Sequence, residues 1–185
     1  TLVLQALYRD RGRSRADLAR ELGLSRVTIS EVVADLLDEQ LVIELGTRAD
    51  SRPGKPATML DVNRQGHSII GLDLSSSGSF VGVVTDLDGV VVARAEVGIP
   101  QASGDAAVRA VETLLQDLVA LAPRPVLGAG VGTPGIVDDR GVVVSAPNLG
   151  WRDVPLQERL IAVCGLPVAV ANDANAALVG EHSFG

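Results

Sequence analysis

Hydrophobic residues recur at helical spacing in three segments near the start of the chain: residues 1–8, 15–22 and 26–38. In the third segment they form the stripe of a helix that packs on one side: Ile29, Val32, Val33, Leu36 and Leu37. Ser14 and Ser25 precede the last two segments as helix caps, and Asp17 makes the first of them a capping box. Gly23 ends the second segment. The pattern predicts three helices, with a tight turn between the last two.

Two runs of aliphatic and β-branched side chains follow the third helix, with a polar loop between them: residues 41–45 and 57–62, separated by 46–56. The loop carries Arg48, Arg52 and Lys55 with few opposing charges. Two short helices joined by a tight turn are typical of a helix-turn-helix, and the hairpin behind them forms a wing. We therefore expect an α+β winged helix-turn-helix domain over residues 1–62.

From residue 63 onward, strand patterns alternate with helix patterns. The expected elements are, in order, strands 69–74, 80–87 and 90–97, helix 105–121, strand 126–131, a small hairpin over 135–145, helix 155–164, strand 167–171 and a last helix from Asn172. An Asp88-Gly89 turn makes the second and third strands antiparallel neighbours, whereas strands alternating with helices indicate parallel ones. Residues 63–185 are expected to form an α/β domain with a mixed sheet, and residues 147–151 a loop.

Composition narrows the class of protein. Hydrophobic residues make up 46% of the chain and aromatic ones 2%, so the core is aliphatic and a disordered chain is excluded. No apolar run approaches the ~18 residues of a membrane helix and no secretory signal is seen, so we expect a cytoplasmic protein. Cys164 is the only cysteine, which excludes an internal disulfide and a cysteine-based zinc site. We expect no cofactor and no metal in this chain.

The formal net charge of −7 belongs to the second part of the chain. Of 16 basic and 23 acidic residues, nine of each lie in residues 1–60, which leaves seven basic and 14 acidic residues in 61–185. This asymmetry indicates that the two parts have different tasks. A neutral domain still binds phosphates where its basic side chains cluster and its acids face elsewhere.

The first turn of the third helix carries a guanidinium, a methyl-bearing side chain and two hydroxyls, groups that contact base edges and phosphates. Asp35 and Asp38 lie farther along, so the helix is expected to enter a DNA groove by its N-terminal end. The predicted DNA contacts are these side chains and the basic ones of the wing: Arg26, Val27, Thr28, Ser30, Arg48, Arg52 and Lys55. The alternative is a small helical bundle whose surface happens to carry arginines.

Three stretches together carry a resemblance to a known family: Gly132-Thr133-Pro134-Gly135-Ile136-Val137, Pro147-Asn148-Leu149-Gly150-Trp151 and Asn172-Asp173-Ala174-Asn175-Ala176-Ala177. The chain resembles the repressor, open-reading-frame and kinase (ROK) family, whose regulators join a winged helix-turn-helix to an actin-like (ribonuclease H-like) sugar-kinase fold. Gly54-Lys55-Pro56-Ala57 is similar to the wing of those regulators. The resemblance implies a truncated fold, with the first lobe in residues 63–185 and the family's second lobe, which carries a structural zinc motif, outside this chain.

The same resemblance implies a sugar site. In family kinases the aspartate matching Asp173 takes a proton from a sugar hydroxyl, and the asparagines matching Asn172 and Asn148 hold other hydroxyls together with the backbone of Gly132 and Thr133. A carboxylate beside a carboxamide at a strand end, facing glycine-rich backbone, supplies the donors and acceptors that a polyol requires. Two simpler interpretations stay open: the glycines are turn residues, and the Asn-Asp pair is a helix N-cap.

The phosphate loop of the family's kinases is altered here. Those kinases place Asp-x-Gly-Gly-Thr-Lys after the first strand, whereas this chain reads Asp73-Leu74-Ser75-Ser76-Ser77-Gly78. Side chains at the glycine positions hinder close approach to a phosphate, and Gly78 stands where the lysine is expected. The sequence therefore predicts that the chain is not an enzyme.

These patterns predict a sequence-specific DNA-binding transcriptional regulator, a repressor of sugar-metabolism genes controlled by a sugar or sugar-phosphate effector. The expected partners are an operator duplex, the effector and a second copy in a homodimer or higher homo-oligomer, with no membrane. One alternative is a ROK-type sugar kinase with an appended DNA-binding domain. Another is a regulator that has lost ligand control and uses its α/β part only to oligomerise.

Overall fold

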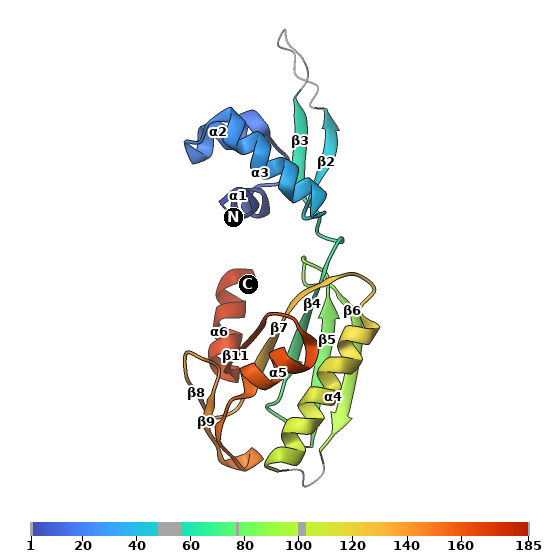
Figure 1. The fold of residues 1–185 in the computed structure, drawn as a ribbon, viewed down its shortest axis with the longest axis vertical. Helices are drawn as coiled ribbons and strands as arrows, with labels where there is room; N and C mark the ends of the chain where they lie inside the picture. The colour runs from blue at the N-terminus through green and yellow to red at the C-terminus, as the bar shows by residue number, and fades with distance from the viewer. Residues whose placement is uncertain (1, 48–56, 77, 100–102, 185) are drawn as a thin grey trace. The chain divides into compact units, whose positions relative to one another are not determined.

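The chain divides into two compact units, Thr1–Gly66 and His67–Gly185 (Figure 1). The structure, a computed structural model, describes residues 2–47, 57–76, 78–99 and 103–184. The first unit holds three helices and an antiparallel sheet in the order β1-β3-β2. Its elements are α1 (Leu2–Arg9), β1 (Arg13–Ser14), α2 (Arg15–Leu22), α3 (Arg26–Asp38), β2 (Val42–Thr47) and β3 (Thr58–Val62). The predicted helices and hairpin strands are confirmed.

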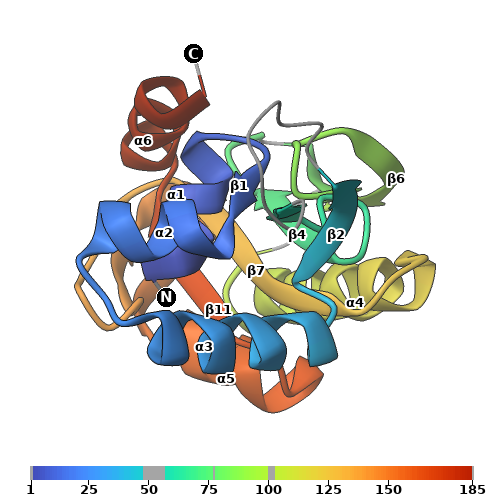
Figure 2. The same cartoon turned by 90° about the horizontal axis from the view of Figure 1, so that it is seen from above.

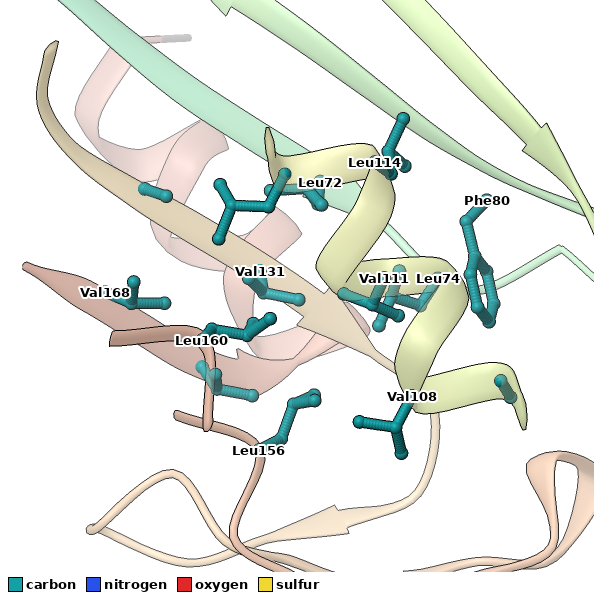
Figure 3. Packing of buried hydrophobic residues seen from close by; sticks show 14 of the residues in the cluster. Leu72, Leu74, Phe80, Val108, Val111, Leu114, Val131, Leu156, Leu160 and Val168 are labelled. Atoms are coloured by element: carbon teal, nitrogen blue, oxygen red, sulfur yellow. The ribbon is translucent and has the colours of Figure 1, made fainter. Parts of the chain in front are cut away.

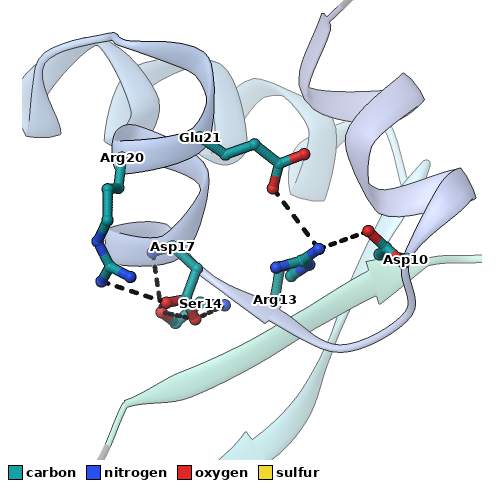
Figure 4. A network of polar contacts seen from close by, with 6 residues as sticks. All are labelled: Asp10, Arg13, Ser14, Asp17, Arg20 and Glu21. Carbon is teal, nitrogen blue, oxygen red and sulfur yellow. Dashed lines mark hydrogen bonds and ion pairs between the residues drawn. The ribbon is translucent and has the colours of Figure 1, made fainter.

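Serine caps begin α2 and α3, as predicted. The Asp17 amide donates to Ser14 Oγ over 3.2 Å, and the Ser14 amide donates to Asp17 Oδ2 over 3.2 Å, which completes the capping box (Figure 4). Gly23 ends α2 in the left-handed conformation, with φ of 65°. Ser25 Oγ accepts from the Thr28 amide over 3.0 Å at the start of α3. All these partners are at most three residues apart, so the sequence pattern alone reveals them.

Arg13 ties the segment before α2 to two acidic side chains. Its guanidinium pairs with Asp10 and lies 3.7 Å from Glu21 (Figure 4). The hydrogen bond to Asp10 raises the pKa of Arg13. Arg13 and Ser14 also form the short strand β1, which pairs with β3 and which the sequence did not predict. Two residues carry no periodicity, so such a strand is visible only through its partner.

One side of α3 closes the core of the first unit. Ile29 and Val33 are fully buried and Leu36 is almost so, while the other two positions of the predicted stripe are half-buried. Fully buried leucines of α1, α2 and β3 complete this core: Leu7, Leu18 and Leu60. Each such aliphatic side chain stabilises the fold by roughly 2 kcal/mol. Burial of this side leaves the opposite side of α3 in solvent.

A five-stranded sheet in the order β11-β7-β4-β5-β6 forms the second unit. β4, β5 and β6 are antiparallel, while β4–β7 and β7–β11 are parallel, so the predicted mixed sheet is confirmed. The elements are β4 (Ser68–Asp73), β5 (Ser79–Thr85), β6 (Val91–Gly98), α4 (Asp105–Leu121), β7 (Val126–Thr133), α5 (Leu156–Cys164), β11 (Val168–Asn172) and α6 (Asp173–Phe184). Figure 2 shows α4 and α5 on one side of the sheet and α6 on the other. Within the described residues, every helix is too short or too polar to cross a membrane.

Aliphatic side chains from α4, α5 and one face of the sheet form a single core (Figure 3). They include Val108, Val111 and Leu114 of α4, Leu156 and Leu160 of α5, and Leu72, Val131 and Val168 of the sheet. Phe80 and Trp151 are its aromatic members. Because alternate residues of a strand point to opposite faces, this core uses every second position and leaves the rest for the far face.

Residues 147–151 are not the loop that the sequence predicts. The elements here are β8 (Ile136–Val137), β9 (Val143–Ala146), η1 (a 3-10 helix, Pro147–Leu149) and β10 (Trp151–Val154). The three strands form an antiparallel sheet in the order β10-β9-β8, the second sheet of this unit. Trp151 is buried, and its Nε1 donates to the Gly104 carbonyl over 2.9 Å. That anchor is 47 residues away, so no local pattern reveals it.

An ion-pair cluster connects α4 to α5. The Arg159 guanidinium of α5 lies 2.7 Å from Asp105 and 2.8 Å from Glu112, both on α4. The hydrogen bond from Arg159 lowers the pKa of the Asp105 carboxyl. Asp105 is exposed, whereas Arg159 and Glu112 are half-buried, and solvent screens part of their attraction. These pairs therefore orient α5 while the apolar core holds it.

We expect Ser14→Ala to lower the free energy of unfolding of the first unit by about 1 kcal/mol, because the Asp17 amide loses its acceptor, Ser14 Oγ, while the backbone amide of residue 14 is kept. Urea unfolding followed by far-ultraviolet circular dichroism measures this change. Trp151 fluorescence, which reports on the second unit, should keep its midpoint. Changing Ser14 and Asp17 together should destabilise by less than the sum of the single changes. Identical unfolding curves for Ser14→Ala and the parent chain would contradict the assignment.

Candidate functional site

The first turn of α3 faces solvent. Arg26, Val27, Thr28 and Ser30 are all exposed, with 66% of Val27 accessible. Among the described residues, no carboxylate pairs with the Arg26 guanidinium. Ile29, within the same turn, is fully buried on the opposite side. The turn is therefore fixed by its own core residue while the four predicted contact residues stay in water.

The two hydroxyls of this turn are partly engaged within the helix. Ser30 Oγ donates to the Arg26 carbonyl over 2.8 Å, and Thr28 Oγ1 lies 2.9 Å from Ser25 Oγ. Each hydroxyl oxygen still has a lone pair that can accept. The Arg26 guanidinium keeps its donors for an outside acceptor, such as the paired acceptor atoms of a guanine edge.

The remainder of α3 is unsuited to an anionic surface. Asp35 and Asp38 are exposed farther along the helix. Contact with a polyanion is therefore restricted to the N-terminal end, where the helix dipole also favours negative charge. The three wing residues predicted to contact DNA, Arg48, Arg52 and Lys55, lie outside the described residues.

In the second unit, a pocket of about 820 Å³ opens on the far face of the sheet. It lies at the carboxyl ends of β4, β7 and β11 and the start of α6, the usual place for ligands in α/β folds. Small side chains form much of its wall, including Gly130, Ala169, Ala171 and Ala174. The sequence prediction missed these residues, although the alternate strand positions of Gly130, Ala169 and Ala171 are the signal that could have found three of them.

Two carboxylates line the pocket. Asp173 begins α6, and its Oδ1 accepts from the Ala174 amide over 2.8 Å. Asp73 ends β4, and its Oδ1 accepts from the Ser75 amide over 2.9 Å. A Cβ atom at Gly132 would lie 3.5 Å from the Cα atom of Asp173, so the end of β7 packs closely against the start of α6. The pocket therefore brings together Gly132 and Asp173, two of the residues predicted to bind a sugar.

Asn172 connects two parts of the site. Its Nδ2 donates to the Gly135 carbonyl over 2.9 Å, and its Oδ1 accepts from the Asn175 amide over 3.2 Å. The carboxamide thus joins the glycine-rich turn to the first turn of α6. This is the helix-capping role that the sequence left open, and Asn172 is not part of the pocket wall.

Two other predicted sugar ligands also lie off the pocket wall. Thr133 is fully buried, and its Oγ1 donates to the Pro134 carbonyl over 3.4 Å. Asn148 is exposed on η1. Gly150 follows it in the left-handed conformation, with φ of 65°. The structure therefore gives Thr133 a packing position and leaves Asn148 with its carboxamide in solvent.

The serine loop after β4 uses its own backbone donors. The Ser75 amide donates to Asp73, and the Gly78 amide lies 3.4 Å from Ser76 Oγ as its acceptor. Amides with internal acceptors are less available to cradle a phosphate. Over the residues that the structure describes, no three His, Cys, Asp or Glu side chains gather as a metal site requires.

The fold and the pocket define the class: a winged helix-turn-helix unit followed by the first lobe of an actin-like fold. The model of the ROK family matches residues 69–185. The chain belongs to the ROK family.

Similar proteins include both regulators and kinases. A xylose repressor of Caldicellulosiruptor bescii is 32% identical over 192 residues, covering 100% of this chain and 47% of the relative. A ROK family transcriptional regulator, a homolog of the E. coli MLC protein, superposes with a TM-score of 0.84 at 24% identity, over 98% of this chain and 47% of that chain. A ROK family glucokinase from Streptomyces griseus, solved with glucose and AMPPNP, gives a TM-score of 0.57 at 34% identity, over 64% of this chain and 37% of that chain. The chain spans about half the length of the curated relatives it matches.

We expect Gly135→Ala to destabilise the second unit by about 2 kcal/mol or more. Its φ is 94°, and an added Cβ would meet the Ser145 carbonyl oxygen at 2.1 Å, so the turn cannot accept a side chain without moving. Gly130→Ala is the control, because it has no heavy atom within 4 Å of the added carbon. Urea unfolding followed by Trp151 fluorescence compares the two. Equal midpoints for both variants would show that the turn is not tightly constrained.

Proposed function

We propose that this chain forms the DNA-binding and effector-sensing part of a cytoplasmic transcriptional repressor of sugar genes. The observation that carries the proposal is the exposed first turn of α3, with Arg26 unpaired among the described residues and Ile29 anchoring it from behind. Alignment of the whole chain with a xylose repressor at 32% identity supports it.

On DNA, the N-terminal end of α3 enters a major groove and the basic wing contacts the neighbouring backbone. The acidic side chains Asp35 and Asp38 are then kept away from phosphates. A homodimer presents two such helices to half-sites about 34 Å apart, or a multiple of that. Effector binding changes this spacing if the ligand favours one conformation of the dimer by a few kcal/mol.

The pocket suits a neutral sugar better than a sugar phosphate as the effector. Asp73 and Asp173 both line the pocket, so a phosphate would face two carboxylates, whereas sugar hydroxyls donate to them. The small side chains that line the pocket leave room for a sugar ring. The names of the relatives make xylose the first sugar to test.

A sugar kinase is the second candidate, because Asp173 is retained and a ROK glucokinase shares the fold of this lobe. The serine loop argues against it. Ser75 and Ser76 replace glycines, no lysine follows, and the Ser75 and Gly78 amides have internal acceptors.

Arg26→Ala should remove operator preference, reducing the ratio of specific to non-specific affinity about 10- to 100-fold, because a bidentate base contact is lost. Gel-shift titrations against a selected operator and a scrambled duplex measure the ratio. Arg152→Ala, an exposed arginine of the second unit, is the control and should leave it unchanged. Unchanged selectivity in Arg26→Ala removes this residue from base recognition. Arg52→Ala or Lys55→Ala should instead weaken binding to both duplexes and lower the salt slope by about one.

Calorimetric titration with xylose, glucose and their phosphates tests the pocket. We expect heat with a neutral sugar and at least about tenfold weaker binding in Asp173→Asn, which keeps an oxygen that can accept from the Ala174 amide but loses the charge. Asp139→Asn, an exposed aspartate that does not line the pocket, should bind normally. With ATP present, a coupled assay should detect no ADP release. Heat with none of the sugars would favour the alternative of a regulator that only oligomerises.

A further inference from the structure

Glu31 is an exposed acid in the second turn of α3, beside the side chains proposed to contact DNA. It follows Ser30 directly and lies about 6 Å, or one turn, beyond Val27 on the outward side of the helix. That side is opposite Ile29 and Val33, which are fully buried. The carboxylate of Glu31 therefore faces solvent on the same side of α3 as the proposed contact surface.

Within the described residues of the first unit, no ion pair, side-chain hydrogen bond or helix cap engages the Glu31 carboxylate. Its neighbour one turn farther along is Asp35, a like charge that slightly destabilises the helix. Arg26 is five residues away, beyond the spacing of three or four at which side chains on a helix meet. The contacts of the described fold therefore give no reason for an acid at position 31.

The direction of helix side chains brings this acid toward the bases. Side chains on an α-helix lean toward its N-terminus, so a long side chain covers the turn before its own. In the proposed function, on which this inference rests, the N-terminal end of α3 is the end that enters the groove. The Glu31 carboxylate then reaches forward beside Val27, while Asp38 stays at the far end of the helix.

A carboxylate in the major groove discriminates between bases. When ionised it only accepts hydrogen bonds, whereas guanine and thymine present acceptors there. Adenine presents its N6 amino group next to the N7 acceptor, and cytosine presents its N4 amino group with no acceptor beside it on the same base. The edge of cytosine is therefore the one that suits a glutamate best.

We infer that Glu31 determines specificity at this surface, and that its carboxylate accepts a hydrogen bond from the N4 amino group of a cytosine in each operator half-site. Phosphates repel the same carboxylate, so Glu31 lowers the affinity for every duplex that lacks this cytosine. Its contribution is discrimination between sequences, because the unpaired charge is unfavourable on the wrong site. Arg26 and Glu31 thus have different roles, one attracting the duplex and the other rejecting wrong sequences.

Selection of duplexes from a random pool by the parent chain, Glu31→Gln and Glu31→Ala tests the inference. The parent chain should enrich cytosine at one position of each half-site, and Glu31→Ala should lose that preference. Glu31→Gln should prefer adenine there, because a carboxamide donates to N7 and accepts from N6. In gel-shift titrations, discrimination at this position should be at least about fivefold for the parent chain and below about twofold for Glu31→Ala.

A modified base tests the same contact without changing the protein. N4-methylcytosine still pairs with guanine, but a methyl group replaces the hydrogen that its amino group presents to the major groove. In place of the selected cytosine, it should weaken binding by the parent chain at least about fivefold, because the donor is lost. Binding by Glu31→Ala should stay unchanged.

Asp38→Asn is the matched control, because Asp38 is also an exposed acid on the outward side of α3 but lies at its C-terminal end. It should raise the affinity for all duplexes slightly, through lost repulsion, and keep every base preference. Circular dichroism checks that each variant folds.

The inference is overturned if Glu31→Ala keeps every base preference of the parent chain, or if the parent chain binds N4-methylcytosine as well as cytosine. Where Arg26→Ala loses operator preference while the Glu31 variants behave like Asp38→Asn, only this inference is overturned and the DNA proposal stands. A parent chain that enriches no sequence overturns both.

Discussion

Burial of Ile29, Val33 and Leu36 determines which side of α3 meets water, and the candidate DNA surface depends on that choice. The three side chains lie on one side of the helix because of its period, so Arg26 and Val27 have to face out. The Ser25 cap fixes where the helix begins and therefore which residues occupy the exposed first turn. A helix shifted by one residue would bury a different set and would not present the same side chains.

In the second unit, burial likewise determines which side chains face the core, but along strands, where alternate residues point to opposite faces. Positions of β4, β7 and β11 that face α4 and α5 are large and aliphatic, such as Leu72 and Val131. Several positions between them are small, such as Gly130 and Ala169, and these line the pocket. The alternation of large and small side chains along these strands therefore forms the core on one face of the sheet and leaves space for a ligand on the other. The edge strand β6 shows the same alternation, since its positions facing away from the core carry Arg94 and Glu96.

Features with local causes could be predicted from the sequence, and features with distant causes could not. The caps at Ser14 and Ser25 join residues within three positions, so residue type and spacing reveal them. β10 exists because it pairs with β9 and because Trp151 hydrogen-bonds a carbonyl 47 residues away. The role of Asn172 also could not be predicted from the sequence alone. Its residue type suits a sugar or a cap, and only its bonds to Gly135 and Asn175 identify the cap.

Charge connects the two proposed activities. Residues 61–185 hold 14 acidic and seven basic side chains, and two of the acids line the pocket. Carboxylates there suit a neutral polyol and disfavour a phosphate. The same surplus repels a duplex, so the second unit opposes any arrangement that lays it along DNA. Only the neutral first unit, through the end of α3 remote from Asp35 and Asp38, can approach the phosphates closely. In the proposed function, the acidic second unit thus suits a neutral sugar and restricts how the protein approaches DNA.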